Sequence, residues 1–160
     1  MANFQQQLEK ANAIKPEMVS KALFDFIKSI EKELIDLNKK QLNEDSKDIY
    51  GEAIGFYSYA TEVISKGSKK RGEPFDAKDT GGFLNNFYMT VLNETFYFGS
   101  TDPKTDDILD SPNWLSSDLF GLSEENLREV IETKFKPFVI EYYRKSLGVW
   151  KQKLLKNQIL

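Results

Sequence analysis

A regular stripe of apolar residues near the N-terminus constrains the fold of this 160-residue chain more than any other feature. Apolar side chains recur every three or four positions from Val19 to Leu37, a spacing that places them on one face of an α-helix. Pro16 suits the first turn of that helix, and the pattern stops near Leu42. The sequence therefore predicts a long N-terminal helix packed into a core rather than into a coiled coil. A short polar helix is expected before it, at residues 3–12.

Residues 83–100 predict an antiparallel β-hairpin. Apolar and polar side chains alternate in two runs, and Asn93-Glu94 lies between them as a tight turn. Both faces of the hairpin are partly apolar. We therefore expect one face to pack against helices and the other, which includes Tyr88 and Tyr97, to meet a partner subunit.

The last predicted element is a helix that opens at Ser123. This serine can cap the helix, and the two acidic residues after it suit the positive end of the helix dipole. Apolar residues then follow at helical spacing, with a kink expected just before Pro137 and a second candidate break at Gly148. The whole chain thus predicts a single α+β domain over residues 1–160, with a long N-terminal helix, a β-hairpin and a C-terminal helix.

Two segments predict loops. Residues 43–82 are rich in glycine and lack a sustained period, and long loops of this kind are usually functional or ordered by partners. Residues 101–118 are acidic and rich in turn formers. Their apolar pair, Trp114 and Leu115, either folds back onto the domain or anchors a partner.

Charge is distributed unevenly along the chain. The net charge is −3, yet residues 144–160 carry five basic residues and no acidic one. This tail could contact nucleic acid or an acidic partner, or it could be a helix C-terminus whose cations meet the dipole. A second basic patch lies within the first loop and comprises Lys66, Lys69, Lys70 and Arg71. A nucleic-acid-binding module that uses both segments is therefore one hypothesis, although the patch lacks interleaved aromatic residues.

The chain contains no cysteine and no histidine. This composition excludes disulfides, thiolate nucleophiles, serine–histidine pairs and metal sites built from either residue. Carboxylate chemistry, lysine chemistry and a hard cation held by oxygens are the mechanisms that remain. We therefore expect a protein that is not an enzyme and that holds no cofactor or metal.

The sequence shows neither a membrane span nor a secretion signal. No apolar run approaches the roughly 20 residues that a spanning helix needs. The first residues also lack the basic start and apolar centre of a signal peptide. We expect a soluble protein that follows no export route and binds no membrane.

The tripeptide Asp79-Thr80-Gly81 matches the catalytic loop of retroviral-type aspartic proteases. Those enzymes need two carboxylates that share a proton, in a fold that is nearly all β. Here Lys78 would hold the aspartate ionised, and the rest of the chain predicts mainly helices. We favour a structural turn, in which Asp79 and Thr80 accept backbone N–H bonds and Gly81 and Gly82 allow positive φ. This turn would lead straight into the first strand of the hairpin.

Four short motifs follow one another in an order that resembles a known family. They are residues 48–61 (DIYGEAIGFYSYAT), 79–83 (DTGGF), 98–101 (FGST) and 119–126 (LFGLSEEN). The sequence resembles the virion-morphogenesis and tail-completion proteins of tailed bacteriophages, which are small proteins of the neck and tail. The resemblance runs from residue 48 to about residue 130, over half of the chain.

The resemblance implies a structural virion protein that assembles as a ring at the head–tail neck or the tail terminus, without enzymatic activity or a cofactor. Its location would be the virion, after assembly in the cytoplasm of the bacterial host. Its partners would be further copies of the chain and neighbouring neck or tail proteins. We expect the protein contacts to come from the predicted loops and hairpin, with these candidate residues: Tyr57, Tyr59, Tyr88, Tyr97, Trp114 and Leu115.

Overall fold

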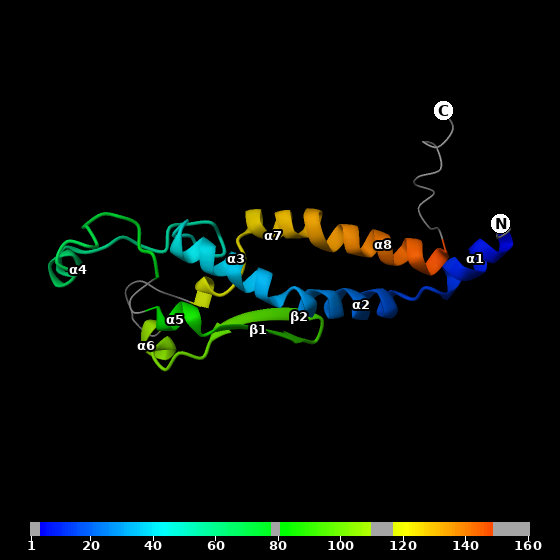
Figure 1. The fold of residues 1–160 in the computed structure, drawn as a ribbon, viewed down its shortest axis with the longest axis horizontal. Coiled ribbons are helices and arrows are strands. Elements are labelled where there is room, and N and C mark those ends of the chain that lie inside the picture. The colour runs from blue at the N-terminus through cyan, green and yellow to red at the C-terminus, as the bar shows by residue number, and fades with distance from the viewer. Residues whose placement is uncertain (1–3, 78–80, 110–116, 149–160) are drawn as a thin grey trace, which may run out of the picture.

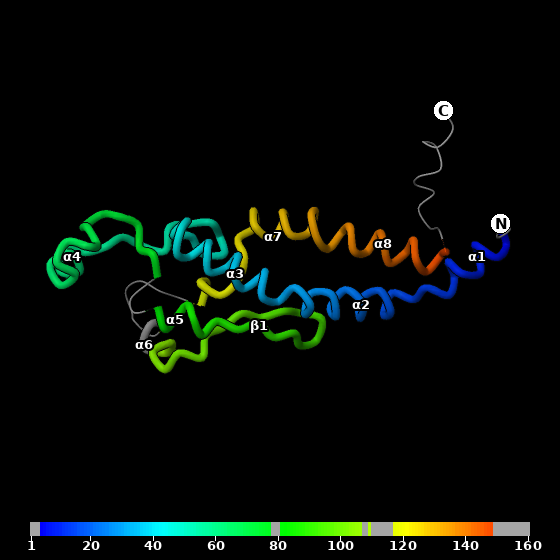
Figure 2. The backbone as a smooth tube through the Cα atoms, in the orientation of Figure 1, coloured from blue at the N-terminus to red at the C-terminus, as the bar shows by residue number. Residues whose placement is uncertain are grey.

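The computed structural model describes residues 4–77, 81–109 and 117–148, and it confirms the predicted α+β fold class. In chain order the elements are α1 (Phe4–Ala13), α2 (Pro16–Ser29), α3 (Glu31–Asn43), α4 (Tyr59–Ile64), α5 (Gly82–Asn85), β1 (Phe87–Leu92), β2 (Thr95–Ser100), α6 (Thr105–Leu109), η1 (Ser117–Leu119), α7 (Glu124–Val130), η2 (Ile131–Phe135) and α8 (Lys136–Leu147). The molecule is elongated, with α2 and α3 along its long axis, the sheet on one side and α7–α8 on the other (Figure 1). Helix α1 and the end of α8 lie together at one end (Figure 2).

The predicted long helix consists of α2 and α3, which meet at Ile30. Pro16 begins α2, and α3 ends at Asn43, close to the predicted limits. Ile30 departs from helical geometry with φ −108° and ψ 17°, yet its N–H still donates to the carbonyl of Phe26 at 3.2 Å. Leu34 in turn donates to the carbonyl of Ile30 at 3.1 Å, so hydrogen bonds continue across the junction.

The hairpin has the predicted pairing and turn. Leu92 lies opposite Thr95 in an antiparallel register, so Asn93 and Glu94 form a two-residue turn. Both turn residues have positive φ, 49° and 57°, as a type I′ turn requires.

One face of the hairpin packs against helices, as predicted. Phe87 and Met89 are buried on that face, and Met89 joins a cluster with residues of α2 and α3. Tyr88 and Tyr97 are exposed on the opposite face. The Tyr88 ring covers Gly99, where an added Cβ would lie 2.7 Å from Tyr88 Cζ.

The turn at Gly81 leads into a helix and not into a strand. Gly81 has a φ of 88°, and its carbonyl accepts a hydrogen bond from Asn85 at 2.9 Å, which closes the first turn of α5. Phe83 and Leu84 are adjacent and both buried, whereas a strand would point them to opposite faces. The predicted start of the hairpin at residue 83 is therefore wrong, and β1 begins at Phe87. Asp79 and Thr80 lie outside the described residues.

The C-terminal helix begins at the predicted serine, and both candidate breaks coincide with irregularities of the backbone. The N–H of Asn126 donates to Ser123 Oγ at 3.3 Å, so Ser123 caps α7. The irregularity expected before Pro137 is η2, a π-helical turn that widens the helix where the proline ring would crowd the preceding turn. Gly148 ends α8 with a φ of 69°.

Two apolar clusters form the core. The first joins the end of α3 to α5, β1 and η1, with these buried members: Leu42, Ile54, Ala77, Phe83, Leu84, Phe87 and Leu119. The second joins α2 and α3 to β1 and the C-terminal helices, with these buried members: Ile27, Leu34, Met89, Leu122, Val130 and Phe135. Helix α3 contributes to both clusters and so connects the two halves of the molecule.

Gln41, on α3, is fully buried and binds two segments, one just after α3 and the other 82 residues away at Ser123. Its Oε1 accepts hydrogen bonds from the backbone N–H of Ser123 at 2.7 Å and from the side-chain amide of Asn126 at 2.8 Å. Its Nε2 donates to the carbonyl of Asp48 at 3.0 Å. One side chain therefore fixes both the start of α7 and the chain that leaves α3.

Asn38, one turn earlier, is also fully buried and holds the segment before α7. Its Nδ2 donates to the carbonyl of Leu119 at 3.1 Å and to that of Gly121 at 2.7 Å. Gly121 has a φ of 152°, and an added Cβ would lie 3.0 Å from Ile49 Cγ2. The backbone at Gly121 thus passes close to a side chain of the loop after α3.

We predict that Gln41→Leu lowers the free energy of unfolding by about 3 kcal/mol, because the N–H of Ser123 and the carbonyl of Asp48 lose a buried partner. The same substitution at the exposed Gln5 should change it by less than about 0.5 kcal/mol. Urea unfolding followed by circular dichroism measures both variants. A Gln41→Leu variant as stable as the Gln5→Leu control would show that the network contributes little.

Candidate interaction surface

The segment predicted as a long loop forms an ordered projection, residues 55–76, which we call the arm. Its two ends pair with each other: Phe75 N donates to the carbonyl of Gly55 at 2.9 Å, and Gly72 N donates to the carbonyl of Tyr57 at 3.0 Å. Helix α4 lies between them, with Ser58 Oγ accepting from the N–H of Thr61 at 3.1 Å as its cap. Figure 1 shows α4 at the end of the molecule farthest from α1.

A tight turn at Asp48 precedes the arm. Asp48 Oδ1 accepts hydrogen bonds from the N–H groups of Tyr50 at 2.8 Å and of Glu52 at 2.9 Å. Gly51 has a φ of 77°, which this turn needs. Ile54 then enters the first apolar cluster. The first sequence motif therefore begins with a turn that anchors the arm to the core.

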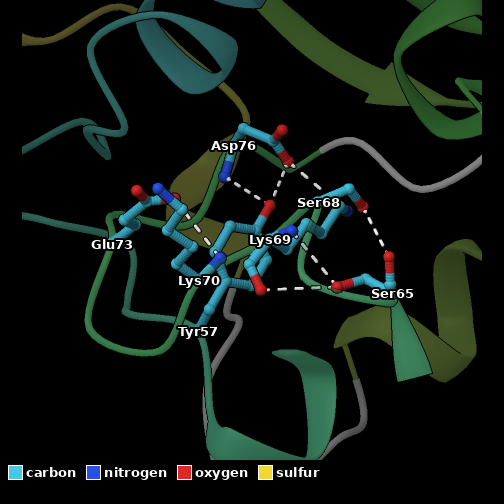
Figure 3. Close-up of polar contacts among 7 residues, drawn as sticks. All are labelled: Tyr57, Ser65, Ser68, Lys69, Lys70, Glu73 and Asp76. Atoms are coloured by element: carbon cyan, nitrogen blue, oxygen red, sulfur yellow. Dashed lines mark hydrogen bonds and ion pairs between the residues drawn. The ribbon is translucent and has the colours of Figure 1, made fainter. Parts of the chain in front are cut away.

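Tyr57, Asp76 and Lys69 hold the two sides of the arm together (Figure 3). The Tyr57 hydroxyl donates a short hydrogen bond to Asp76 Oδ1, and the Asp76 N–H donates to the same hydroxyl at 3.3 Å. Lys69 Nζ lies 3.7 Å from Asp76 Oδ1 and 5.1 Å from the centre of the Tyr57 ring. We call these three residues the clasp.

Burial raises the pKa of Tyr57 to about 12, and the hydrogen bond to Asp76 acts in the same direction. Ionisation would place a phenolate beside a carboxylate, so the folded protein favours the neutral phenol. A neutral phenol suits a structural hydrogen bond and is poorly suited to proton abstraction.

The basic loop after α4 is held by its own polar groups. The N–H of Lys69 donates to Ser65 Oγ at 3.1 Å, and Ser68 Oγ donates to the carbonyl of Ser65 at 2.9 Å (Figure 3). The N–H of Lys70 donates to a Glu73 carboxylate oxygen at 3.3 Å. The backbone between α4 and the returning side of the arm is therefore fixed.

Apolar side chains are exposed on the arm despite this order. The exposed fractions are 82% for Ile64, 65% for Tyr59, 63% for Phe56 and 57% for Val63. Of the predicted basic patch, Lys66, Lys70 and Arg71 are exposed beside them, whereas Lys69 is half-buried in the clasp.

The predicted contact residues lie in three different places. Tyr59 is on the exposed face of the arm, and Tyr88 and Tyr97 are on the outer face of the hairpin. Tyr57 is only 7% exposed, so we correct its expected role from subunit contact to the clasp. Trp114 and Leu115 lie outside the described residues.

The sequence prediction missed three exposed residues of the arm, namely Phe56, Val63 and Ile64. The available signal was Ser58 followed three residues later by Thr61, a capping pattern that opens a short apolar helix. Because the segment was predicted as a loop, its apolar residues were not considered as one face.

The part of the chain that the structure describes contains neither a cluster of metal ligands nor a membrane-spanning helix. No three acidic side chains there converge closely enough to hold a metal ion. No helix within the same ranges has both the length and the apolar character needed to cross a bilayer.

Comparison of the chain with protein-family models, with curated proteins and with solved structures found no match.

We predict that Tyr57→Phe removes an ionisation near pH 12 that wild-type protein shows in ultraviolet absorbance, since Tyr57 is the residue with that pKa. The raised pKa of Tyr57 in the folded state also determines how the free energy of unfolding changes with pH. The contribution of Tyr57 is fully present below its unfolded value of 10 and is lost as the pH rises towards about 12. The stability difference between wild type and Tyr57→Phe should therefore shrink across that window. A difference that stayed constant from pH 9 to pH 12 would contradict the role of the clasp.

Proposed function

We propose that this chain is a structural subunit that assembles with copies of itself into a ring at the neck or tail terminus of a tailed bacteriophage. The arm carries the proposal. It holds Phe56, Tyr59 and Ile64 more than half exposed on a hydrogen-bonded projection. Apolar side chains that a fixed backbone keeps in solvent are typical of a surface that another protein covers.

The positions of the four family-like motifs support this proposal. Ile54, Phe83 and Leu119 come from three of the motifs and share the first apolar cluster. Ser100, from the remaining motif, donates its hydroxyl to the carbonyl of Phe83 at 2.8 Å. The motifs thus meet in the body that carries the arm, and their named contacts pack and position the backbone. Such a set of contacts suits a structural protein, and we propose no catalytic role and no cofactor.

A nucleic-acid-binding module remains the alternative function. Its two basic segments lie far apart, because the arm is at one end of the molecule and the end of α8, with Arg144 and Lys145, is at the other (Figure 2). The arm also mixes its four cations with three carboxylates, those of Glu62, Glu73 and Asp76. One copy therefore offers no continuous basic stripe in its described part, which favours the assembly function.

We predict that purified wild-type protein forms a closed ring, seen by light scattering and negative-stain microscopy. The double variant Tyr59→Ser/Ile64→Ser should raise the dissociation constant of assembly at least about tenfold, because it removes exposed apolar contact area. Leu8→Ser, at the opposite end of the molecule, is the matched control and should assemble normally.

A wild-type protein that stays monomeric at high concentration would contradict the assembly function. Binding of duplex DNA that weakens with salt, and weakens further in Lys70→Ala/Arg71→Ala, would instead support the alternative.

A further inference from the structure

We propose that the arm of one copy docks into a groove beside α7 of a neighbouring copy, so that each subunit gives one arm and receives another. The inference rests on the proposed function, because it names the two surfaces through which the ring would form. Neither surface lies on the outer face of the hairpin, where Tyr88 and Tyr97 were predicted to meet a partner.

The arm offers apolar surface next to positive charge that is not used within the copy. Lys66, Lys70 and Arg71 are exposed in the loop that follows α4. Within the described ranges their side chains form no ion pair, whereas Lys69 contacts Asp76 in the clasp. A partner that covers the apolar face of the arm would therefore also meet these three cations.

The groove lies between the loop at residues 47–51 and α7, and its volume is about 800 Å³. Tyr50 lines it and is 71% exposed, an open aromatic surface at the groove wall. Two of its carboxylates are paired: Glu124 with Arg128 at 2.6 Å, and Glu132 with Lys136 at 2.8 Å.

Two further carboxylates in the groove, Glu125 and Glu129, form no ion pair with any described residue. They are exposed on α7. The groove is lined by these four carboxylates and by two cations, Lys47 and Arg128, so it is negative on balance, in contrast to the loop after α4.

The two surfaces match in both apolar character and charge. Tyr50 can receive the apolar face of α4, while Glu125 and Glu129 can receive the free cations of the arm. In such interfaces the buried apolar anchors supply most of the affinity, and the charges at the rim set orientation and association rate. A groove with unpaired carboxylates also repels phosphate, so a second copy of the chain fits these surfaces better than nucleic acid does.

The two surfaces occupy different parts of one copy. Helix α4 lies at one end of the molecule and α7 nearer its middle, so docking leaves each copy with an unused arm or an unused groove (Figures 1 and 2). Contacts between unlike surfaces let each copy bind a further copy. Such growth stops only when the last subunit binds the first and the ring closes.

Charge reversal in trans tests the inference. The arm variant is Lys70→Glu/Arg71→Glu, the groove variant is Glu125→Lys/Glu129→Lys, and Lys15→Glu/Lys32→Glu is the control for charge change elsewhere. Circular dichroism first checks that each variant keeps the wild-type fold. Each of the first two variants should raise the dissociation constant of assembly at least about tenfold, while the control should not.

The mixture of the arm variant with the groove variant gives the decisive result. Every contact between the two variants pairs opposite charges, wild-type arm with wild-type groove and reversed arm with reversed groove. The mixture should therefore assemble again with the two variants in equal amounts, although each alone assembles poorly. A chain that carries all four reversals should assemble again, because the charges are complementary once more. Rings that form in both single-surface variants as readily as in wild type would overturn the docking inference and leave the proposed function standing. A wild-type protein that never assembles would overturn both.

Discussion

The body of the protein depends on two buried amides on one helix. Gln41 and Asn38 project from α3 and satisfy backbone groups of the chain after α3 and of the chain before α7. Backbone polar groups without water need such partners, because leaving them unpaired costs about 1–3 kcal/mol each. The same helix contributes to both apolar clusters. Together with the apolar contacts of Ile54 and Leu119, these amides hold the loop that leads to the arm against the chain that enters the helix lining the groove.

Side-chain hydrogen bonds also fix the backbone of the arm. Its two sides are joined by backbone hydrogen bonds and by Tyr57, Asp76 and Lys69, so its exposed face does not have to become ordered when a partner binds. A surface that is ordered in advance loses less conformational entropy on association. The structure thus separates the two tasks: the clasp fixes the backbone, while Ile64 and the other apolar residues of α4 remain available for contact.

Periodic and local signals predicted the helices and the hairpin well. These signals depend only on neighbours close in sequence. They are the apolar stripe from Val19 to Leu37, the turn at Asn93-Glu94, the cap at Ser123 and the irregularity before Pro137. The start of β1 was misplaced because Phe83 and Leu84 are buried by tertiary contacts that no local pattern reveals. No local pattern marks Gln41 and Asn38 as buried, since the partners that they bind before α7 are about 80 residues away. The sequence predicted a loop at the arm for a related reason. The arm is ordered by hydrogen bonds between residues 55–57 and residues 72–76, which are not neighbours in sequence. The burial of Tyr57 follows from this pairing.

The central claim is that a preformed arm mediates self-assembly, and hydrogen–deuterium exchange at low and high protein concentration tests it most directly. The account predicts that the amides of Tyr57, Gly72 and Phe75 are already protected in dilute protein, because they are hydrogen-bonded within one copy. At high concentration, additional protection should appear in α4 and in α7. Arm amides that exchange freely in dilute protein, or added protection confined to the hairpin, would contradict the account.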